Sequence, residues 1–100
     1  MIRYTTPTIT FDLPFEASYL TAAYITMQQG SIVVNKTLND CKTSDGTLSV
    51  TLSQEETASF VANTSPVKAQ LRCIGNDGKA YASRQFKLNV EDVLKEGVLE

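Results

Sequence analysis

Few side chains in this sequence are of the types that carry out catalysis or bind metals. The chain of 100 residues has no histidine and only two cysteines. Histidine is the commonest general base and the usual partner of a serine or cysteine nucleophile. A zinc site of the Cys/His type would need more ligands than Cys41 and Cys73 supply. We therefore expect a protein that is not an enzyme and that uses no metal and no cofactor.

Two acidic motifs have structural explanations. Glu55 and Glu56 could be imagined as an acid/base pair, but Ser53-Gln54-Glu55-Glu56 matches a capping box, in which the first and last side chains bond each other's backbone amides. Asn76-Asp77-Gly78 resembles part of a calcium loop, yet further carboxylates at the required spacing are missing. The sequence also has no G-x-S-x-G, P-loop or G-x-G-x-x-G motif. A helix start and a turn are the simpler interpretations.

The two cysteines leave two alternatives open. A disulfide would require Cα atoms within about 7 Å. A cytosolic pair normally stays reduced, and Cys73 falls on the apolar side of a predicted strand while Cys41 lies beside a loop. Free thiols, one of them buried, are the interpretation that we favour.

Contact with other proteins is the activity that remains, and candidate contact residues lie at three places in the sequence. Phe15 and Tyr19 lie in a predicted loop between strands and could form a contact patch. Arg84 falls on the apolar side of the last predicted strand, where it indicates a local bulge, a snorkelling side chain, or a partner carboxylate in an interface. The residues after Glu91 combine acidic side chains with four large aliphatic ones, which are Val93, Leu94, Val98 and Leu99.

So many aliphatic residues in a terminal segment argue for docking rather than free solvation. We expect residues 93–99 to pack against a strand face of the same chain or of a second copy, and to support a weak homo-oligomer. A disordered end, or one folded back on its own domain, is the alternative.

Short strands must position these residues. Apolar and polar residues alternate with a period of two, and turn motifs recur at short intervals. We predict strands near 8–13, 20–28, 31–38, 47–52, 67–73 and 80–90, an ambiguous edge segment at 39–43, and a helix at 54–60. This pattern indicates one all-β domain over residues 1–100, a sandwich of six or seven antiparallel strands with one short helix and a C-terminal tail at 91–100.

The second predicted strand has apolar residues on both faces. Ala22 and Tyr24 lie on one face, and Ala23, Ile25 and Met27 lie on the other. This predicts a central strand that is covered on both sides, or a face that meets a partner. The predicted core of the whole domain consists of Ile9, Phe11, Leu13, Ile25, Val34, Leu48, Val50, Leu52, Phe60, Leu71, Phe86 and Leu88.

The last hairpin has two possible registers. A two-residue turn at Asp77-Gly78 places Lys68 opposite Lys87, and a four-residue loop separates these lysines. In both registers Arg84 lies on the apolar side. We expect Ala80 and Ala82 to face inward with Phe86 and Leu88, and Tyr81 to face outward.

Charge and hydropathy exclude several partners. Nine basic and eleven acidic residues give a net charge of −2, whereas nucleic-acid binding usually requires a basic patch. No apolar stretch approaches the roughly 18 residues of a membrane helix. Residues 1–7 lack the apolar core of a signal peptide. We therefore expect synthesis in the cytoplasm, with no nucleic acid and no membrane as partner.

The order of motifs along the chain resembles a known group of proteins. Thr6-Pro7 and Thr10-Phe11-Asp12-Leu13-Pro14-Phe15 open the chain, and Asp77-Gly78 and Glu91-Asp92-Val93-Leu94 close it. In this order the sequence resembles short proteins encoded in phage and prophage tail regions of Gram-positive gut bacteria. More loosely, it is similar to the N-terminal immunoglobulin-like domain of phage baseplate upper proteins. The resemblance implies an immunoglobulin-like sandwich, and it transfers no functional residue.

Two functions are therefore expected from the sequence. The first, which the resemblance implies, is a structural or assembly module of a phage tail or baseplate, with other virion proteins as partners and the virion as a location. The second is a free-standing adaptor or carbohydrate-binding sandwich. Sugar-binding proteins commonly present exposed aromatic side chains, often tryptophan, and this chain has no tryptophan.

Overall fold

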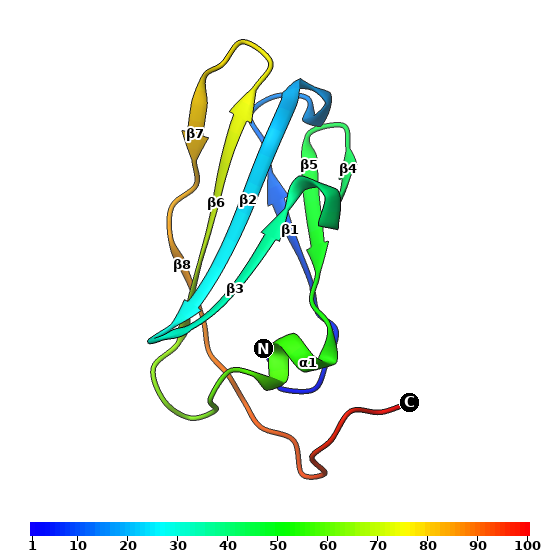
Figure 1. The fold of residues 1–100 in the computed structure, drawn as a ribbon, viewed down its shortest axis with the longest axis vertical. Helices are drawn as coiled ribbons and strands as arrows, with labels where there is room; N and C mark the ends of the chain where they lie inside the picture. Colours follow the sequence, from blue (N-terminus) through cyan, green and yellow to red (C-terminus); the bar gives the residue numbers. More distant parts are fainter.

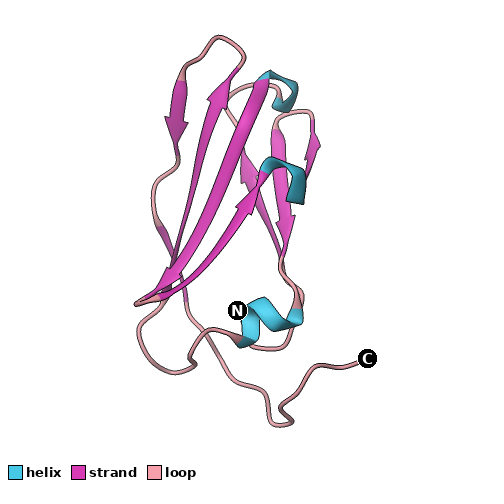
Figure 2. Cartoon of the chain, in the orientation of Figure 1, coloured by secondary structure: helices cyan, strands magenta, loops and turns pink.

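The computed structural model describes residues 1–100 and contains two antiparallel sheets that pack against each other (Figure 1). Strands make up nearly half of the chain, and the short helices lie at the ends of the sheets (Figure 2). The smaller sheet has the strand order β1–β5–β4, and the larger has the order β3–β2–β6–β7, with β8 also paired to β6. The strands are β1 (Thr8–Asp12), β2 (Leu20–Gln29), β3 (Ile32–Thr37), β4 (Cys41–Ser44), β5 (Thr47–Thr51), β6 (Val67–Gly75), β7 (Ala80–Ala82) and β8 (Phe86–Leu88).

This connectivity is that of an immunoglobulin-like sandwich. β1, β5 and β4 take the places of strands B, E and D, and β3, β2, β6 and β7–β8 take those of C′, C, F and G. The predicted fold class is confirmed. There are eight strands rather than six or seven because the ambiguous segment forms β4, after a 3₁₀ turn at Leu38–Asp40, and because the last predicted strand is divided in two.

The core lies between the sheets and is closed at one end by α1 (Gln54–Ala58). Seven predicted core residues are buried, and the other five are half-buried at its margin. The buried ones are Phe11, Ile25, Leu48, Val50, Leu52, Phe60 and Leu71, and the half-buried ones are Ile9, Leu13, Val34, Phe86 and Leu88. β2 and β6 add residues that the predicted core did not include, such as Met27 and Val67, which are fully buried.

The capping box predicted at Ser53 starts α1. Ser53 Oγ accepts a hydrogen bond from the Glu56 amide at 3.1 Å, and Glu56 Oε1 accepts one from the Ser53 amide at 2.8 Å. The helix ends at Ala58, two residues earlier than predicted, because the chain then turns to bury Phe60 in the core. An ion pair of 2.7 Å between Glu56 and Lys36 of β3 connects the helix to the larger sheet.

The turn between β6 and β7 has neither of the two predicted lengths. Gly75 pairs with Lys79 across three residues, 76–78, and Gly78 adopts a φ of 80°. Three-residue hairpin loops commonly end in a residue of this left-handed conformation, which glycine adopts without strain. The register therefore differs by one residue from each predicted alternative, with Arg72 opposite Ala82.

A bulge between β7 and β8 changes the register again. Beyond it Ala69 lies opposite Phe86 and Lys68 opposite Lys87, so the three residues 83–85 face only two residues of β6. Ser83 stabilises the bulge: its amide donates to the Leu71 carbonyl at 2.8 Å, and its Oγ accepts from the Leu71 amide at 3.0 Å.

The bulge reverses the predicted faces of β7. Tyr81 lies opposite Cys73, which points into the core, so Tyr81 is on the inner side of the sheet. Ala80 and Ala82 are exposed on the outer side. The prediction that these alanines face inward is wrong, because a shift of one residue moves every side chain of a strand to the other face.

Candidate interaction surface

Phe15 and Tyr19 lie at the end of the sandwich where the β6–β7 turn is found. Tyr19 belongs to a short 3₁₀ turn, Ala17–Tyr19, within the segment predicted as a loop. The ring centroid of Phe15 lies 4.9 Å from that of Tyr19 and 5.1 Å from that of Tyr81. Both Phe15 and Tyr19 are half-buried. The two predicted contact residues therefore come together, but they contact each other and Tyr81 over much of their surface.

The Tyr19 hydroxyl fixes this aromatic cluster. It donates a hydrogen bond to Asp77, and it lies 3.4 Å from the Tyr81 hydroxyl. These hydrogen bonds, first that to Asp77, raise the pKa of Tyr19 well above its ordinary value. A Cβ atom at position 75 would overlap the Tyr19 ring, so Gly75 makes room for it. The cluster closes this end of the domain.

Arg84 is exposed and lies within the bulge, where it pairs with no residue of β6. Neither predicted register holds at β7, so the side of the sheet that Arg84 faces stays a prediction. Of the three explanations that the sequence left open, the local bulge is the one that the structure contains. Because an arginine in a bulge can point into water, its presence in this strand does not require a partner carboxylate.

The C-terminal segment, residues 91–100, leaves the sandwich at the end that holds α1 (Figure 1). Val93 is half-buried, Leu94 is fully exposed, and Val98 and Leu99 are also exposed. Polar bonds hold the segment in place. Arg3 pairs with Asp92 at 2.9 Å, and the Gln54 side chain bonds the backbone of Leu99 in both directions at 2.8 and 2.9 Å.

These bonds place the C-terminal segment beside α1 and not on a strand face of its own chain. The prediction that it packs on such a face within one chain is therefore wrong. The segment is held through the carboxylate of Asp92 and the backbone of Leu99, whereas the Leu94 side chain is fully exposed. Aliphatic side chains therefore do not fix its position. Packing against a second copy stays a prediction.

The outer side of the larger sheet carries an apolar patch around one arginine. The strand register places Ala22, Ile74 and Ala80 in one row across the sheet, and Tyr24, Arg72 and Ala82 in the next. Tyr24 is 53% exposed and Ile74 is 39% exposed. We call these six residues the Arg72 face. Alternation along β2 indicated that Ala22 and Tyr24 could meet a partner, but the alanines of β7 belong to this face only because of the bulge.

The Arg72 face has an unbalanced charge. Between residues 57 and 90 the sequence has five basic residues and one acidic residue, Asp77. The ion pairs of the structure involve only Arg3 and Lys36, so the Arg72 guanidinium has no carboxylate partner. Further along the same side, Lys68 lies directly opposite Lys87. Like charges across a sheet repel each other, so an acidic partner would find this side favourable.

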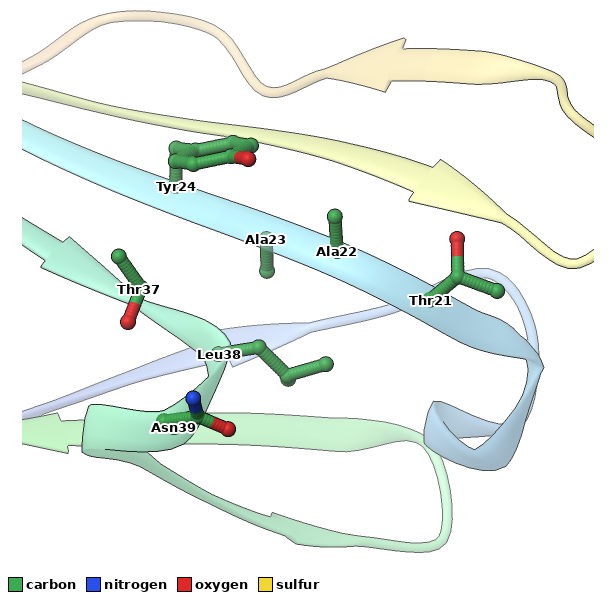
Figure 3. A pocket seen from close by; sticks show the side chains of 7 residues that line it. All are labelled: Thr21, Ala22, Ala23, Tyr24, Thr37, Leu38 and Asn39. Carbon is green, nitrogen blue, oxygen red and sulfur yellow. The ribbon is translucent and has the colours of Figure 1, made fainter.

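A hollow of about 260 Å³ lies beside this face, at an edge of β2 (Figure 3). It exists because β3 pairs only with Tyr24–Gln29 and then leaves the sheet, which exposes the edge of Leu20–Ala23. In Figure 3, Ala22 and Tyr24 point to one side of β2 and Ala23 points to the other. The remaining lining residues are Thr21, Thr37, Leu38 and Asn39.

The outer side of the smaller sheet is different. Thr8 and Thr51 hydroxyls lie 2.8 Å apart, and those of Thr10 and Ser49 lie 2.9 Å apart. Its polar groups therefore satisfy each other across the strands. The Arg72 face, with exposed apolar groups and an unpaired charge, is the stronger candidate for a contact surface.

The cysteines contribute nothing to either surface. Both are free thiols, and Cys73 is buried while Cys41, at the start of β4, is half-buried. Burial raises the pKa of both thiols, which disfavours the reactive thiolate. The interpretation of free cysteines with Cys73 buried is confirmed.

No protein-family model matches the chain, and no curated protein or solved structure matches it. No helix of the structure has the length and apolar character needed to cross a bilayer. The surface itself must therefore indicate the function.

Proposed function

We propose that this protein is a non-enzymatic structural or assembly module of a phage or prophage tail or baseplate, and that it acts through protein–protein contacts. The Arg72 face carries this proposal. The motif order that resembles phage tail-region proteins supports the tail or baseplate as its setting. The chain would be made in the cytoplasm and then built into the particle.

The composition of the Arg72 face suits a protein partner. Tyrosine and arginine are enriched at the centres of protein interfaces, where they supply large contact areas and several hydrogen bonds. Here Tyr24 and Arg72 lie directly opposite each other on neighbouring strands. Ala22, Ala80 and Ala82 surround them with small side chains, which allow a partner to approach closely. The sheet fixes the backbone of all six residues, so little backbone conformational entropy is lost on binding.

Purified particles test this function. After induction of a prophage that carries the gene, density-purified particles are examined by quantitative mass spectrometry, with a cytoplasmic host protein as the contamination standard. We expect the chain in the particles at a fixed ratio to other tail proteins. A strain that carries Arg72→Glu should incorporate less of it, and one that carries Lys42→Glu, with the same charge change at an exposed position of β4 in the smaller sheet, should not. Particles with no more of the chain than of the host protein would refute the proposal.

A carbohydrate-binding or adaptor function is the second candidate, and the hollow beside β2 favours it. Tyr24 offers an exposed ring, and Thr21, Thr37 and Asn39 offer hydroxyl and amide groups around the same space. A glycan array on the intact chain, followed by NMR titration of any hit, tests this function. Binding that Tyr24→Ala abolishes would support it, and shifts that map away from these residues would refute it.

A further inference from the structure

Two complementary features of this chain lie at different places on the domain. The C-terminal segment is acidic and aliphatic, with four acidic residues, one lysine and four large aliphatic residues. The Arg72 face is basic and apolar and has no carboxylate partner. The segment can supply a carboxylate to Arg72, and the face can supply a positive charge and an apolar surface to the segment.

The spacing of the two features also agrees. In an extended segment, residues two apart point to the same side and lie about 6.7 Å from each other. Leu94, Glu96 and Val98 would therefore share one side, with an acid between two aliphatic residues. On β6, Arg72 and Ile74 have the same spacing on the outer side of the sheet. An extended C-terminal segment can thus place Glu96 over Arg72 while Leu94 contacts Ile74.

The chain's own C-terminal segment is held elsewhere. Arg3 binds Asp92 and Gln54 binds the backbone of Leu99, at the end of the domain that holds α1. Glu96 keeps a two-thirds exposed side chain and only a long contact of 3.9 Å with Arg3. Its carboxylate, together with the exposed Leu94 and Val98, is available to another molecule.

We propose that the C-terminal segment of one copy docks on the Arg72 face of the next copy, with Glu96 paired to Arg72 and Leu94 against Ile74. The proposal rests on the proposed function only in taking the Arg72 face as a contact surface. Because the donor segment and the acceptor face are different parts of the molecule, the contact is heterologous. Such a contact repeats from copy to copy and builds rings or open chains.

Sedimentation velocity on the intact chain tests this contact, in a concentration series up to about 1 mM, where even weak association is populated. We expect mass to rise with concentration, and less steeply at high salt because the contact is partly ionic. Arg72→Glu and Glu96→Arg should each weaken association by about tenfold or more, since each places like charges together. Lys42→Glu, at an exposed position of β4 in the smaller sheet, is the control with the same charge change and should leave the association unchanged.

Combined variants sharpen the test. The chain that carries both Arg72→Glu and Glu96→Arg regains the pair with reversed charges and should associate again. A mixture of the two single variants restores the original pair in one direction and the charge-reversed pair in the other, so it should form alternating assemblies although neither variant associates alone. Circular dichroism checks that every variant folds, which is expected because Arg72 and Glu96 are both exposed.

Three results would overturn the proposal: a monomer at every concentration, a Lys42→Glu effect as large as that of Arg72→Glu, or mixed single variants that remain apart. A monomeric chain that is nevertheless present in purified particles would leave the proposed function intact and assign the Arg72 face to a different protein. Association together with absence from particles would instead retain the contact and refute the phage function.

Discussion

Gln29 is a buried polar side chain whose loss should damage this fold severely. It stands at the end of β2 and is only 6% exposed. Its amide group donates to the carbonyls of Val61 and Ser65 at 2.8 and 2.7 Å, and its oxygen accepts from the Val61 amide at 2.7 Å. One side chain thus satisfies three backbone groups of the connection between α1 and β6.

Gln29→Leu removes these three bonds and keeps a side chain of similar size. Each neutral hydrogen bond contributes about 1 kcal/mol net, and a buried amide left without a partner costs more, so we expect a loss of about 3–4 kcal/mol. Added apolar burial offsets little of this, because the stem of Gln29 is already buried. For a domain whose total stability is about 5–15 kcal/mol, such a loss is large.

Urea unfolding measures the effect, and Gln28→Leu supplies the control. Gln28 is the adjacent residue on the exposed side of β2, with one side-chain bond to the Gly30 carbonyl, so its replacement should change stability by less than about 0.5 kcal/mol. Hydrogen exchange should also show that the Val61 amide loses protection in Gln29→Leu only. Equal stability of the two variants, or an unchanged Val61 amide, would refute the reasoning.

Three further predictions concern the ion pair, the core and the aromatic cluster. Burial alone would raise the pKa of Glu56, but bonds from a lysine of β3 and from the helix start outweigh it and lower the pKa below its ordinary 4.5. The ion pair stabilises the fold by about 1 kcal/mol, as is usual for a partly exposed pair. This stabilisation is present above pH 4.5 and is lost as the pH falls through the lowered pKa. In urea unfolding across pH, Glu56→Gln should therefore be less stable than the parent at pH 7 and equally stable in acid. Leu71→Ala should lower the free energy of unfolding by about 2–5 kcal/mol, and Leu88→Ala should lower it clearly less, because Leu71 is buried and Leu88 is half-buried. Equal losses of stability in thermal unfolding would count against the described core. Asp77→Asn removes the carboxylate that keeps Tyr19 protonated, so an ultraviolet titration of the four tyrosines should show Tyr19 ionising at lower pH than in the parent, and an unchanged curve would contradict the hydrogen bond.

Features fixed by neighbours in the sequence could be predicted. Alternation identified the long strands β2 and β6 because burial of one face requires a period of two. The capping box at Ser53 predicted α1 because both partners lie within four residues of each other. An element whose apolar face turned to solvent would lose the free energy of burying it, so the local sequence pattern determines where such an element forms. The role of Gln29 was not predicted, because its hydrogen-bond partners lie more than thirty residues away in the sequence.

The candidate surface was predictable only in part. Apolar residues on both faces of β2 pointed to Ala22 and Tyr24, and aliphatic residues pointed to the C-terminal segment. The other half of the Arg72 face depends on the register of β7, which the three-residue turn and the bulge determine together. Neither of them changes the alternating pattern enough to be seen in the sequence, because Ala80, Tyr81 and Ala82 fit an inward or an outward face almost equally well.

The bulge therefore connects the fold to the proposed contact. With a continuous register from β8, Ala80 and Ala82 would point into the core, and the larger Tyr81 ring would stand on the outer side. The extra residue at 83–85 instead sends Tyr81 to the aromatic cluster with Phe15, which closes the end of the domain. The same shift places two small side chains beside Arg72, where a second chain can approach the guanidinium closely. One local irregularity thus completes the core at one end and opens the surface on which assembly would depend.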